Sequence, residues 1–400
     1  MFKKFRQFIN PNSPKLDENH LVEKIDGTNY NKHTFDKNEF AVCVLPKRYT
    51  KVGQCGEGSY GYVFNAKDQV TGEHVAIKKI TKDSDSSNDP KDIIRFCREL
   101  KILSLLKHKN IIGFHGAFTP SQDTSTFHEM YLVMPFCGLT LRALIVSETR
   151  FIHEEIAYLS HQALCGLQYL HQMGIIHRDL KPDNIALDLD TKVVKIIDFG
   201  MSSMENAVIK TRSGIGTLCY NSPEITFNAN YDSKTDIFSL GCTIYELFSK
   251  RILVYYRPRK DNAGNDIEHM LEMLRLFGTP DITFMNQIQN EHAINWINEQ
   301  EQFLAANWCQ LLPNNIFPDR EDSNVPLTAQ NARNLLQNLL CFNAAERFNA
   351  DQALEHSYFT SCHENKYDLN NEQQGERTLA DWEDILFKEV KQCEGDYKIF

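Results

Sequence analysis

The sequence lacks long apolar runs, and this argues against several classes of membrane protein. No stretch of the 400 residues approaches the roughly 18 apolar residues that a membrane-spanning helix needs. The basic start, Met1 to Arg6, is not followed by an apolar core or a small-residue cleavage site, so no secretory signal is expected. Glycine does not follow Met1, so N-myristoylation is not expected either. We therefore expect no stable membrane association.

Ordered cysteine spacing and an excess of positive charge are also missing. The 11 cysteines are scattered, their number is odd, and no Cys-x-x-Cys pair occurs, which argues against a disulfide framework and a cysteine-rich zinc site. Acidic residues number 53 and basic residues 43, giving a formal net charge of −10. Such a chain is a poor general binder of nucleic acid, so no nucleic-acid partner is expected. Reduced thiols fit a cytoplasmic protein that can also enter the nucleus.

The residue composition and the hydrophobic pattern of the chain change near residue 49. Residues 1–48 are rich in Asn, Asp and Pro, and we predict a loose N-terminal extension with one strand near residues 40–42. Over residues 49–138, short β-branched and aromatic runs are separated by turn residues, which is typical of an antiparallel sheet. One amphipathic helix is predicted within this part, over residues 90–107.

The second half of the chain is mainly helical in pattern. Apolar residues recur at three-to-four spacing in several segments of residues 139–360. Residues 361–400 form a C-terminal extension, in which residues 379–390 are predicted to form an amphipathic helix that packs back on the small lobe. The predicted fold is therefore α+β and bilobal, with a small antiparallel sheet carrying one helix and a larger, mainly helical lobe.

A glycine-rich segment lies near the start of the sheet-rich lobe. Its residues fit G-x-G-x-x-G-x-V: Gly56, Glu57, Gly58, Ser59, Tyr60, Gly61, Tyr62 and Val63. Glycines let backbone amides approach a phosphate with no side chain in the way. No helix follows directly, which argues against a dinucleotide-binding fold. On this pattern alone, a glycine-rich hairpin without a ligand remains an alternative.

The next predicted strand ends in a lysine. In Val75-Ala76-Ile77-Lys78, the ammonium of Lys78 could either reach solvent or sit over nucleotide phosphates. Glu99 lies on the apolar side of the following helix and is the natural carboxylate partner of that lysine. The pair is predicted to orient the Lys78 cation, although surface Glu–Lys pairs are also common.

The segment His177-Arg178-Asp179-Leu180-Lys181-Pro182-Asp183-Asn184 carries the most specific pattern in the chain. Asp179 can accept a proton from a substrate hydroxyl, and Lys181 can steady the charge of a transferring phosphoryl group. Asn184, five positions after Asp179, can bind a metal ion. A charged surface loop is the structural alternative, but the full match disfavours it.

Four further residues complete the pattern. Asp198, in Asp198-Phe199-Gly200, follows an apolar run and is the expected magnesium ligand, because a carboxylate at the end of a buried strand needs a partner. Glu224 is predicted to pair with Arg347, and Asp236 is predicted to cap the backbone of the catalytic loop, the segment from His177 to Asn184. These last interactions would be architectural.

Taken together and in this order, residues 49–360 resemble a eukaryotic protein kinase. The resemblance implies the bilobal kinase fold, ATP and Mg²⁺ as cofactors, and transfer of the γ-phosphoryl group to serine or threonine hydroxyls of protein substrates. It implies that Asn184 and Asp198 hold the metal. It also implies that the adenine pocket involves Ala76 and Val63, a gatekeeper at Met134, and a hinge from Pro135 to Cys137, with the backbone donor at Cys137.

Several stretches resemble the mitogen-activated protein kinases, and the Jun N-terminal (stress-activated) kinases in particular. They are Leu45-Pro46-Lys47-Arg48-Tyr49, His108-Lys109-Asn110-Ile111-Ile112-Gly113, Leu164-Cys165-Gly166-Leu167, Leu276-Phe277-Gly278-Thr279-Pro280 and Trp382-Glu383-Asp384-Ile385-Leu386-Phe387. The resemblance implies a monomer in a stress-signalling cascade, with an upstream MAP kinase kinase and phosphatases as partners.

The activation loop departs from that family. Arg212-Ser213-Gly214 fills the Thr-x-Tyr positions, so only Thr211 and Ser213 are nearby acceptors. Ser203 and Asn221 stand where the family has arginines, and the acidic docking cluster of the C-terminal extension is diluted. These departures predict atypical activation and leave proline direction open. A nucleotide-binding scaffold that resembles a pseudokinase and acts by occupying signalling partners remains the alternative to an active enzyme.

Overall fold

The computed structural model describes residues 21–25, 27–35, 42–58, 61–81, 90–121, 129–147, 150–205, 215–257, 265–317, 327–360 and 362. For residues 21, 57, 58, 90–96 and 265 it describes the backbone alone. The predicted activation-loop sites Thr211 and Ser213, the loop residues Ser59 and Tyr60, and the C-terminal helix over residues 379–390 lie outside these ranges.

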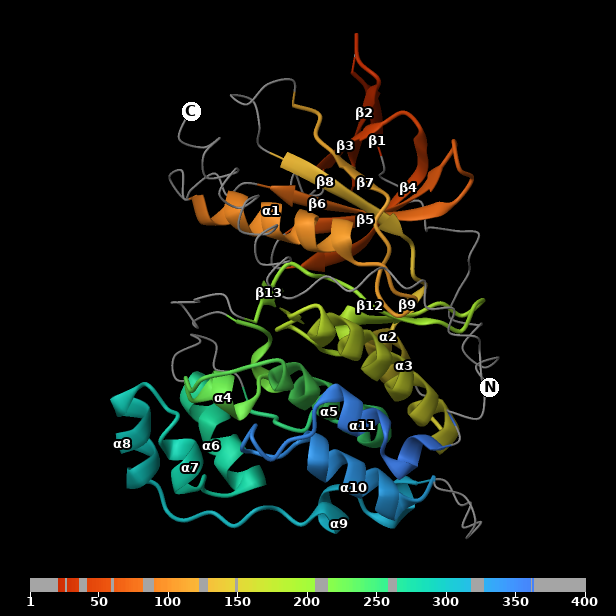
Figure 1. Cartoon of the computed structure of the whole chain (residues 1–400). Helices are drawn as coiled ribbons and strands as arrows, with labels where there is room; N and C mark the ends of the chain where they lie inside the picture. Colours follow the sequence, from red (N-terminus) through yellow and green to blue (C-terminus); the bar gives the residue numbers. More distant parts are fainter. Residues whose placement is uncertain are drawn as a thin grey trace.

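The chain forms mainly strands as far as β8, with α1 between β6 and β7, and then mainly helices, with the short strands β9 to β13 before α4 (Figure 1). The strands are β1 (Leu21–Lys24), β2 (Tyr30–Thr34), β3 (Val42–Pro46), β4 (Tyr49–Gly58), β5 (Gly61–Asp68), β6 (His74–Thr81), β7 (Gly116–Phe118), β8 (Glu129–Pro135), β9 (Leu139–Thr140), β10 (Ile175–Ile176), β11 (Ile185–Leu187), β12 (Val194–Ile196) and β13 (Ser203–Met204). The helices are α1 (Pro90–Leu105), α2 (Leu141–Val146), α3 (His153–Gln172), α4 (Pro223–Thr226), α5 (Lys234–Ser249), α6 (Asn265–Phe277), α7 (Ile282–Met285), α8 (Glu291–Glu299), α9 (Trp308–Leu311), α10 (Ala329–Leu339) and α11 (Ala350–Leu354).

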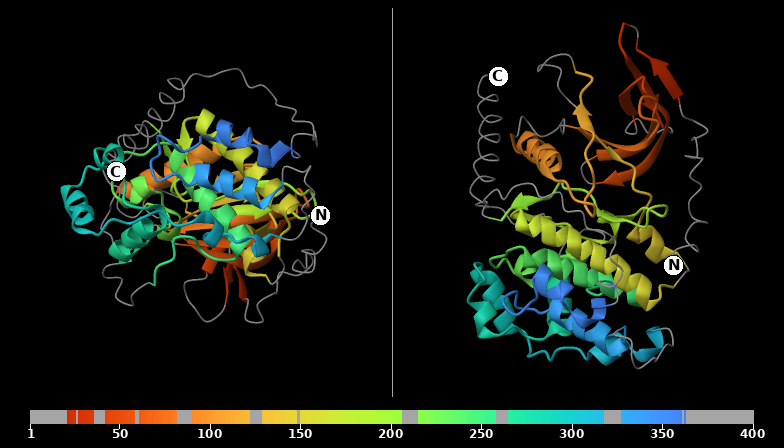
Figure 2. Two further views of the ribbon diagram at one scale, coloured as in Figure 1. Left: turned by 90° about the horizontal axis from the view of Figure 1, so that it is seen from below. Right: turned by 45° about the vertical axis from the view of Figure 1, so that its right-hand side comes forward.

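The small lobe is a five-stranded antiparallel sheet in the order β4-β5-β6-β8-β7, with α1 beside it. Its strands alternate between core-facing and outward residues, as β5 does with Phe64 and Ala66 buried. Figure 2 shows the sheet above the helical lobe from a second direction. The predicted bilobal α+β fold is therefore confirmed.

The N-terminal segment contains more structure than its composition suggests. The prediction of a loose extension is wrong for the described part, because β1, β2 and β3 form a three-stranded antiparallel sheet. Cys43 and Leu45 are fully buried on one face of β3 and pack with Phe64 and Tyr131 of the small lobe. Burial against a neighbouring sheet outweighs the low strand propensity of an Asn- and Asp-rich segment.

The large lobe is built around α3 and α5, which pack against each other in its core. Residues Thr235–Leu247 of α5 are buried on every side, as expected of a helix at the centre of a lobe. Helices α6 and α8 lie toward the outside of the lobe in both figures. No helix in the described ranges is both long enough and apolar enough to cross a membrane.

A buried ion pair joins two distant parts of this lobe. Arg347 and Glu224 form a two-bonded pair at 2.6 and 2.9 Å, with side chains 0% and 1% exposed. The predicted partnership of these residues is confirmed. It ties α4 to the segment between α10 and α11, 123 residues later in the chain.

Candidate active site

A cavity of about 940 Å³ is lined by residues of both lobes. The small lobe contributes strands β4, β5, β6 and β8, and the large lobe contributes the predicted catalytic loop and the segment around Thr217. The predicted pocket residues that line it are Gly56, Gly61, Val63, Ala76, Met134, Pro135 and Cys137. Glu57 and Gly58 continue the backbone of β4.

Gly61 is fixed by a close approach of the backbone. Its φ is 138°, and a Cβ at this position would collide with the carbonyl oxygen of Lys79 on β6. Only glycine fits there without a shift of the sheet. Gly61 is thereby held against β6, where it lines the cavity.

Three charged residues meet at the back of the cavity. The Lys78 Nζ atom lies 2.6 Å from Glu99 Oε1 and 2.8 Å from Asp198 Oδ1. Lys78 comes from β6, Glu99 from α1, and Asp198 follows β12, so the contacts join the sheet, the helix and the large lobe. The structure thus brings together the three residues that the sequence singled out.

The ionisation of this group follows from the balance between burial and pairing. Burial by itself lowers the pKa of Lys78, but the carboxylates of Asp198 and Glu99 outweigh it, and the pKa is raised above its usual range. Burial likewise raises the pKa of Asp198, yet the Lys78 ammonium outweighs it and the pKa is well below its usual range. Lysine and aspartate therefore stay charged throughout the physiological pH range.

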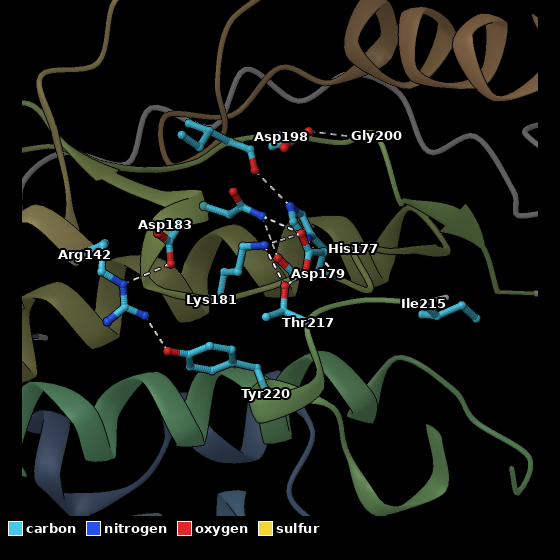
Figure 3. Close-up of polar contacts among 12 residues, drawn as sticks. Arg142, His177, Asp179, Lys181, Asp183, Asp198, Gly200, Ile215, Thr217 and Tyr220 are labelled. Atoms are coloured by element: carbon cyan, nitrogen blue, oxygen red, sulfur yellow. Dashed lines mark hydrogen bonds and ion pairs between the residues drawn. The ribbon is translucent and has the colours of Figure 1, made fainter. Parts of the chain in front are cut away.

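The predicted catalytic loop forms a second cluster in the same cavity, where Asp179, Lys181 and Thr217 lie close together (Figure 3). Asp179 Oδ2 accepts hydrogen bonds from Lys181 Nζ at 2.9 Å and from Asn184 Nδ2 at 3.0 Å. Asp179 Oδ1 accepts a hydrogen bond from Thr217 Oγ1 at 2.7 Å, and Lys181 Nζ also reaches that hydroxyl at 2.6 Å. Both carboxylate oxygens are therefore held in place by donors.

A buried carboxylate fixes the backbone of that loop. Asp236 is fully buried and accepts hydrogen bonds from the backbone N–H groups of His177 at 2.8 Å and Arg178 at 2.9 Å. Its predicted capping role is confirmed. Burial alone raises the pKa of Asp236, but the hydrogen bond from His171 and the surrounding donors lower it overall.

Two residues of the site adopt left-handed backbone conformations. Arg178 has φ 66° and Asp198 has φ 63°, values that are uncommon for residues other than glycine. The capping bonds of Asp236 hold the first, and the Lys78 contact holds the second. Such strain persists only where surrounding contacts over-determine the conformation, and it is concentrated at functional sites.

The hinge has one available backbone donor. Pro135 has no N–H, and the N–H of Phe136 donates to the carbonyl oxygen of His74 at 3.2 Å. Between Pro135 and Cys137, this leaves the N–H of Cys137, which is the hinge donor that the resemblance implies. Met134 lies beside it at the inner end of β8, 9% exposed.

The donor set suits a magnesium ion held largely by a nucleotide. Asp198 and Asn184 both line the cavity, and Asn184 turns its amide nitrogen toward Asp179, which leaves the amide oxygen as its ligating atom. Mg²⁺ commonly binds one or two protein oxygens together with substrate phosphates and water. Within the described ranges there is no group of three or more His, Cys, Asp or Glu side chains that would hold a metal by itself.

The structure also shows participants that the sequence analysis missed. Thr217 contacts Asp179, and Arg142 and Tyr220 line the same cavity. Thr217 lies seven positions before Glu224, and an arginine in the otherwise apolar segment Leu141–Val146 is unusual, so both carried a weak sequence signal. Their contacts depend on long-range packing, which short sequence motifs do not specify.

A family model described as "Protein kinase domain" matches residues 49–359. The chain belongs to the protein kinase family. As the resemblance implied, it is a mitogen-activated protein kinase, similar to the Jun N-terminal kinases, and a serine/threonine kinase.

Curated relatives cover nearly the whole kinase. It is 33% identical to GLH-binding kinase 1 of Caenorhabditis elegans over 369 residues, 89% of this chain and 91% of that protein. It is 30% identical to stress-activated protein kinase JNK of Drosophila melanogaster over 384 residues, 94% of this chain and 96% of that protein. It is 33% identical to mitogen-activated protein kinase 12 of Mus musculus over 351 residues, 86% of this chain and 88% of that protein.

Proposed function

We propose that this kinase transfers the γ-phosphoryl group of ATP to serine and threonine hydroxyls through the residues of the two clusters. Lys78, oriented by Glu99, positions the phosphates. Asp179 orients the acceptor hydroxyl and receives its proton as the oxygen bonds to the γ-phosphorus and the bond to the ADP oxygen breaks. Lys181 offsets the charge on the transferring group.

Magnesium is the proposed metal, and it neutralises phosphate charge when bound. Asn184 and Asp198 would hold it through their side-chain oxygens. The low pKa of Asp198 supports this role, because the carboxylate is ready to bind a cation without first losing a proton.

The observation that carries the proposal is that Asp179 is held by three donors in the same cavity as the Lys78–Glu99–Asp198 group. The test is transfer of radiolabelled phosphate from ATP to a generic acceptor protein by the purified full chain, with Asp179→Asn as the control. We expect transfer by the wild type and a loss of at least about hundredfold in the variant.

A nucleotide-binding scaffold is the competing proposal. It predicts ATP-dependent stabilisation without turnover, and equal signals from wild type and Asp179→Asn in the transfer assay. The complete set of charged residues in the cavity favours the active enzyme, since a scaffold has no need of an oriented Asp179.

We also propose that the enzyme selects proline after the acceptor residue. Asn221 Nδ2 donates to the carbonyl oxygen of Ile215 at 3.0 Å, beside Gly216 in the left-handed region at φ 68°. A Cβ on Gly216 would collide with the Asn221 side chain. Because the Asn221 amide already occupies that carbonyl, a substrate N–H at this place would have to share the acceptor with it and would be bonded less well. Proline has no N–H to satisfy and is therefore favoured.

Peptides that differ only in Ser-Pro against Ser-Ala test this selection. For wild type we expect kcat/KM to be at least about ten times higher with the Ser-Pro peptide than with the Ser-Ala peptide. The ratio should fall in Asn221→Ala, which frees the Ile215 carbonyl. Equal use of both peptides by the wild type would contradict the proposal.

Activation is proposed to be atypical, with low constitutive activity or control by a single phosphate at Thr211 or Ser213. No tyrosine lies between Phe199 and Cys219 to receive a second phosphate. Arg178 donates to the carbonyl of Met201 at 2.6 Å and to the Tyr231 hydroxyl at 3.3 Å, so it is already held by the protein. Mass spectrometry of active protein, with Thr211→Ala and Ser213→Ala assays, separates the two modes. A requirement for two phosphates in this segment would contradict both.

We propose that the kinase acts as a monomer in the cytoplasm, and also in the nucleus, within a stress-signalling cascade. Its family places protein substrates, upstream kinases and phosphatases among its partners in general terms. Fractionation of cells before and after osmotic stress, with the endogenous protein detected by antibody, tests the location. Recovery only with membranes would contradict it.

A further inference from the structure

An arginine of the large lobe occupies an acidic corner of the cavity. Arg142 lies in the first turn of α2 and its guanidinium points toward the catalytic loop and the segment that ends at Tyr220 (Figure 3). All three of its donor nitrogens are used. Nε donates to Asp183 Oδ2 at 3.2 Å, Nη1 to Glu246 Oε1 at 2.5 Å, and Nη2 to the Tyr220 hydroxyl.

The corner is built for a cation. Glu246 comes from the buried helix α5, and its side chain is 3% exposed. The Tyr220 hydroxyl in turn donates to Glu246 Oε2 at 2.7 Å, so both oxygens of that carboxylate are engaged. A carboxylate this deeply buried is costly unless a cation is paired with it. A guanidinium meets this requirement well because its planar fork bonds several acceptors at once.

The charges of the corner do not cancel. Arg142 contributes one positive charge, while Asp183 and Glu246 contribute two negative charges. The side chain of Asp183 is 46% exposed and that of Arg142 is 27% exposed, so the corner is open to the cavity. The site is therefore acidic overall, and its deepest position is filled by the protein's own arginine.

The corner lies on the side of the cavity that receives the acceptor residue. Tyr220 is three residues after Thr217, whose hydroxyl bonds the Asp179 carboxylate. Asp183 is directly before Asn184, which also bonds Asp179. Arg142 and Asp179 line the same cavity, so a peptide with its hydroxyl at Asp179 has Arg142 within the same site.

We propose that Arg142 is a specificity-determining residue that fills an acidic subsite and so prevents it from binding a basic side chain of the substrate. With the arginine in place, an arginine in the peptide finds only the half-exposed edge of Asp183. Without it, the Glu246 carboxylate and the Tyr220 hydroxyl become acceptors for a substrate guanidinium. The burial of Glu246 then favours that guanidinium strongly, because the carboxylate has lost its own cation.

A merely structural role makes a different prediction. If Arg142 only ties α2 to α5, its removal weakens the fold or lowers turnover for all peptides by the same factor. The ratio of the kcat/KM values of two peptides would not change. The ratio is therefore the measurement that separates specificity from stability.

The experiment uses the full chain and pairs of peptides that contain one Ser-Pro acceptor. Members of a pair differ by Arg against Gln at one position, scanned from four residues before the serine to four after it, the proline excepted. For wild type we expect a ratio of kcat/KM, Arg over Gln, of about one or less at every position. For Arg142→Ala we expect the ratio to rise at least about tenfold at one position or more.

Two variants act as controls. Arg142→Ala combined with Glu246→Gln should lose most of the gain, since the buried charge that binds the substrate arginine is gone. Arg333→Ala is the matched control, because Arg333 also joins distant segments, donating to the Leu312 carbonyl at 2.8 Å, but does not line the cavity. Its ratios should equal those of wild type.

If Arg142→Ala does not fold, Arg142→Gln is measured in the same way, with an expected rise of at least about threefold. The proposal rests on the kinase activity proposed above, so the same ratios are also measured as peptide Kd by fluorescence anisotropy. Absent turnover with a changed Kd ratio would contradict the proposed function alone. An unchanged ratio in folded Arg142 variants, or a wild type that already prefers arginine, would overturn the role of Arg142.

Discussion

Removal of the Arg347 guanidinium should destabilise the large lobe more than a typical substitution. Arg347 Nη1 and Nη2 donate to the two oxygens of Glu224, and the same side chain donates to the carbonyls of Cys341 at 3.0 Å, Lys234 at 2.9 Å and Phe342 at 3.2 Å. Arg347→Met removes all five bonds while keeping a similar chain length. It leaves a carboxylate with 1% exposure and no cation.

The magnitude follows from that uncompensated charge. Breaking one partner of a buried pair costs about 3–5 kcal/mol, and it exceeds the median effect of a point mutation, about 1 kcal/mol. With an unfolding entropy of about 2.1 cal/mol/K per residue, each kcal/mol shifts the Tm of this chain by about 1–1.5 °C. We therefore expect Tm to fall by roughly 5 °C, measured by scanning calorimetry and by urea denaturation at pH 7.

A double-mutant cycle shows whether the pair itself is responsible. Glu224→Gln in the Arg347→Met background removes the stranded charge, so the double variant should lose less than the sum of the single variants by at least about 1 kcal/mol. The exposed pair Lys32–Glu23, 3.7 Å apart with side chains 44% and 68% exposed, is the control, and Lys32→Met should change stability by less than about 0.5 kcal/mol. Additive effects of the Glu224 and Arg347 variants would refute the reasoning.

Three further outcomes are expected. Lys78→Met should remain folded but lose phosphoryl transfer by at least about hundredfold, because the phosphates lose their positioning cation; retained turnover in a labelled-ATP assay would count against the site. Thr217→Val should lower kcat by about tenfold to hundredfold because Asp179 loses a donor, while Thr217→Ser retains activity; equal kcat values in the two variants would show that the hydroxyl is not needed. Burial lowers the pKa of His269 from 6.5 to about 4, so the folded state keeps this side chain neutral. Below pH 6.5 the unfolded chain binds a proton at this residue and the folded protein does not, so the free energy of unfolding decreases as the pH falls from 6.5 toward 4. His269→Phe should therefore reduce the loss of unfolding free energy between pH 7 and pH 5 by about 2 kcal/mol, whereas the exposed His292→Phe should not; identical pH profiles in urea titrations would rule out this origin.

The sequence was sufficient for the parts of the site that are set by short segments. Asp179, Lys181 and Asn184 lie within six consecutive residues, and the loop that carries them has little freedom once Asp236 caps it. The pairing of Lys78 with Glu99 also followed from the pattern, because one strand and one helix place both residues on the apolar side of the small lobe.

Predictions from the sequence were wrong for features that depend on residues elsewhere in the chain. The N-terminal extension looked loose because Asn and Asp disfavour strands, but Cys43 and Leu45 are buried against the small-lobe sheet. Asn221 looked like the loss of a functional arginine, yet its amide reaches the Ile215 carbonyl, because Gly216 turns the backbone toward it.

The sequence by itself therefore determined the family, the lobes and the identity of the charged residues that face ATP. Those residues act through local backbone geometry, which a few neighbouring positions specify. Only the tertiary structure decided that Arg142 meets Glu246, 104 residues away, and that Thr217 meets Asp179. Contacts of this kind arise when separate helices and loops pack in one lobe, and their energies depend on burial, which no local pattern records.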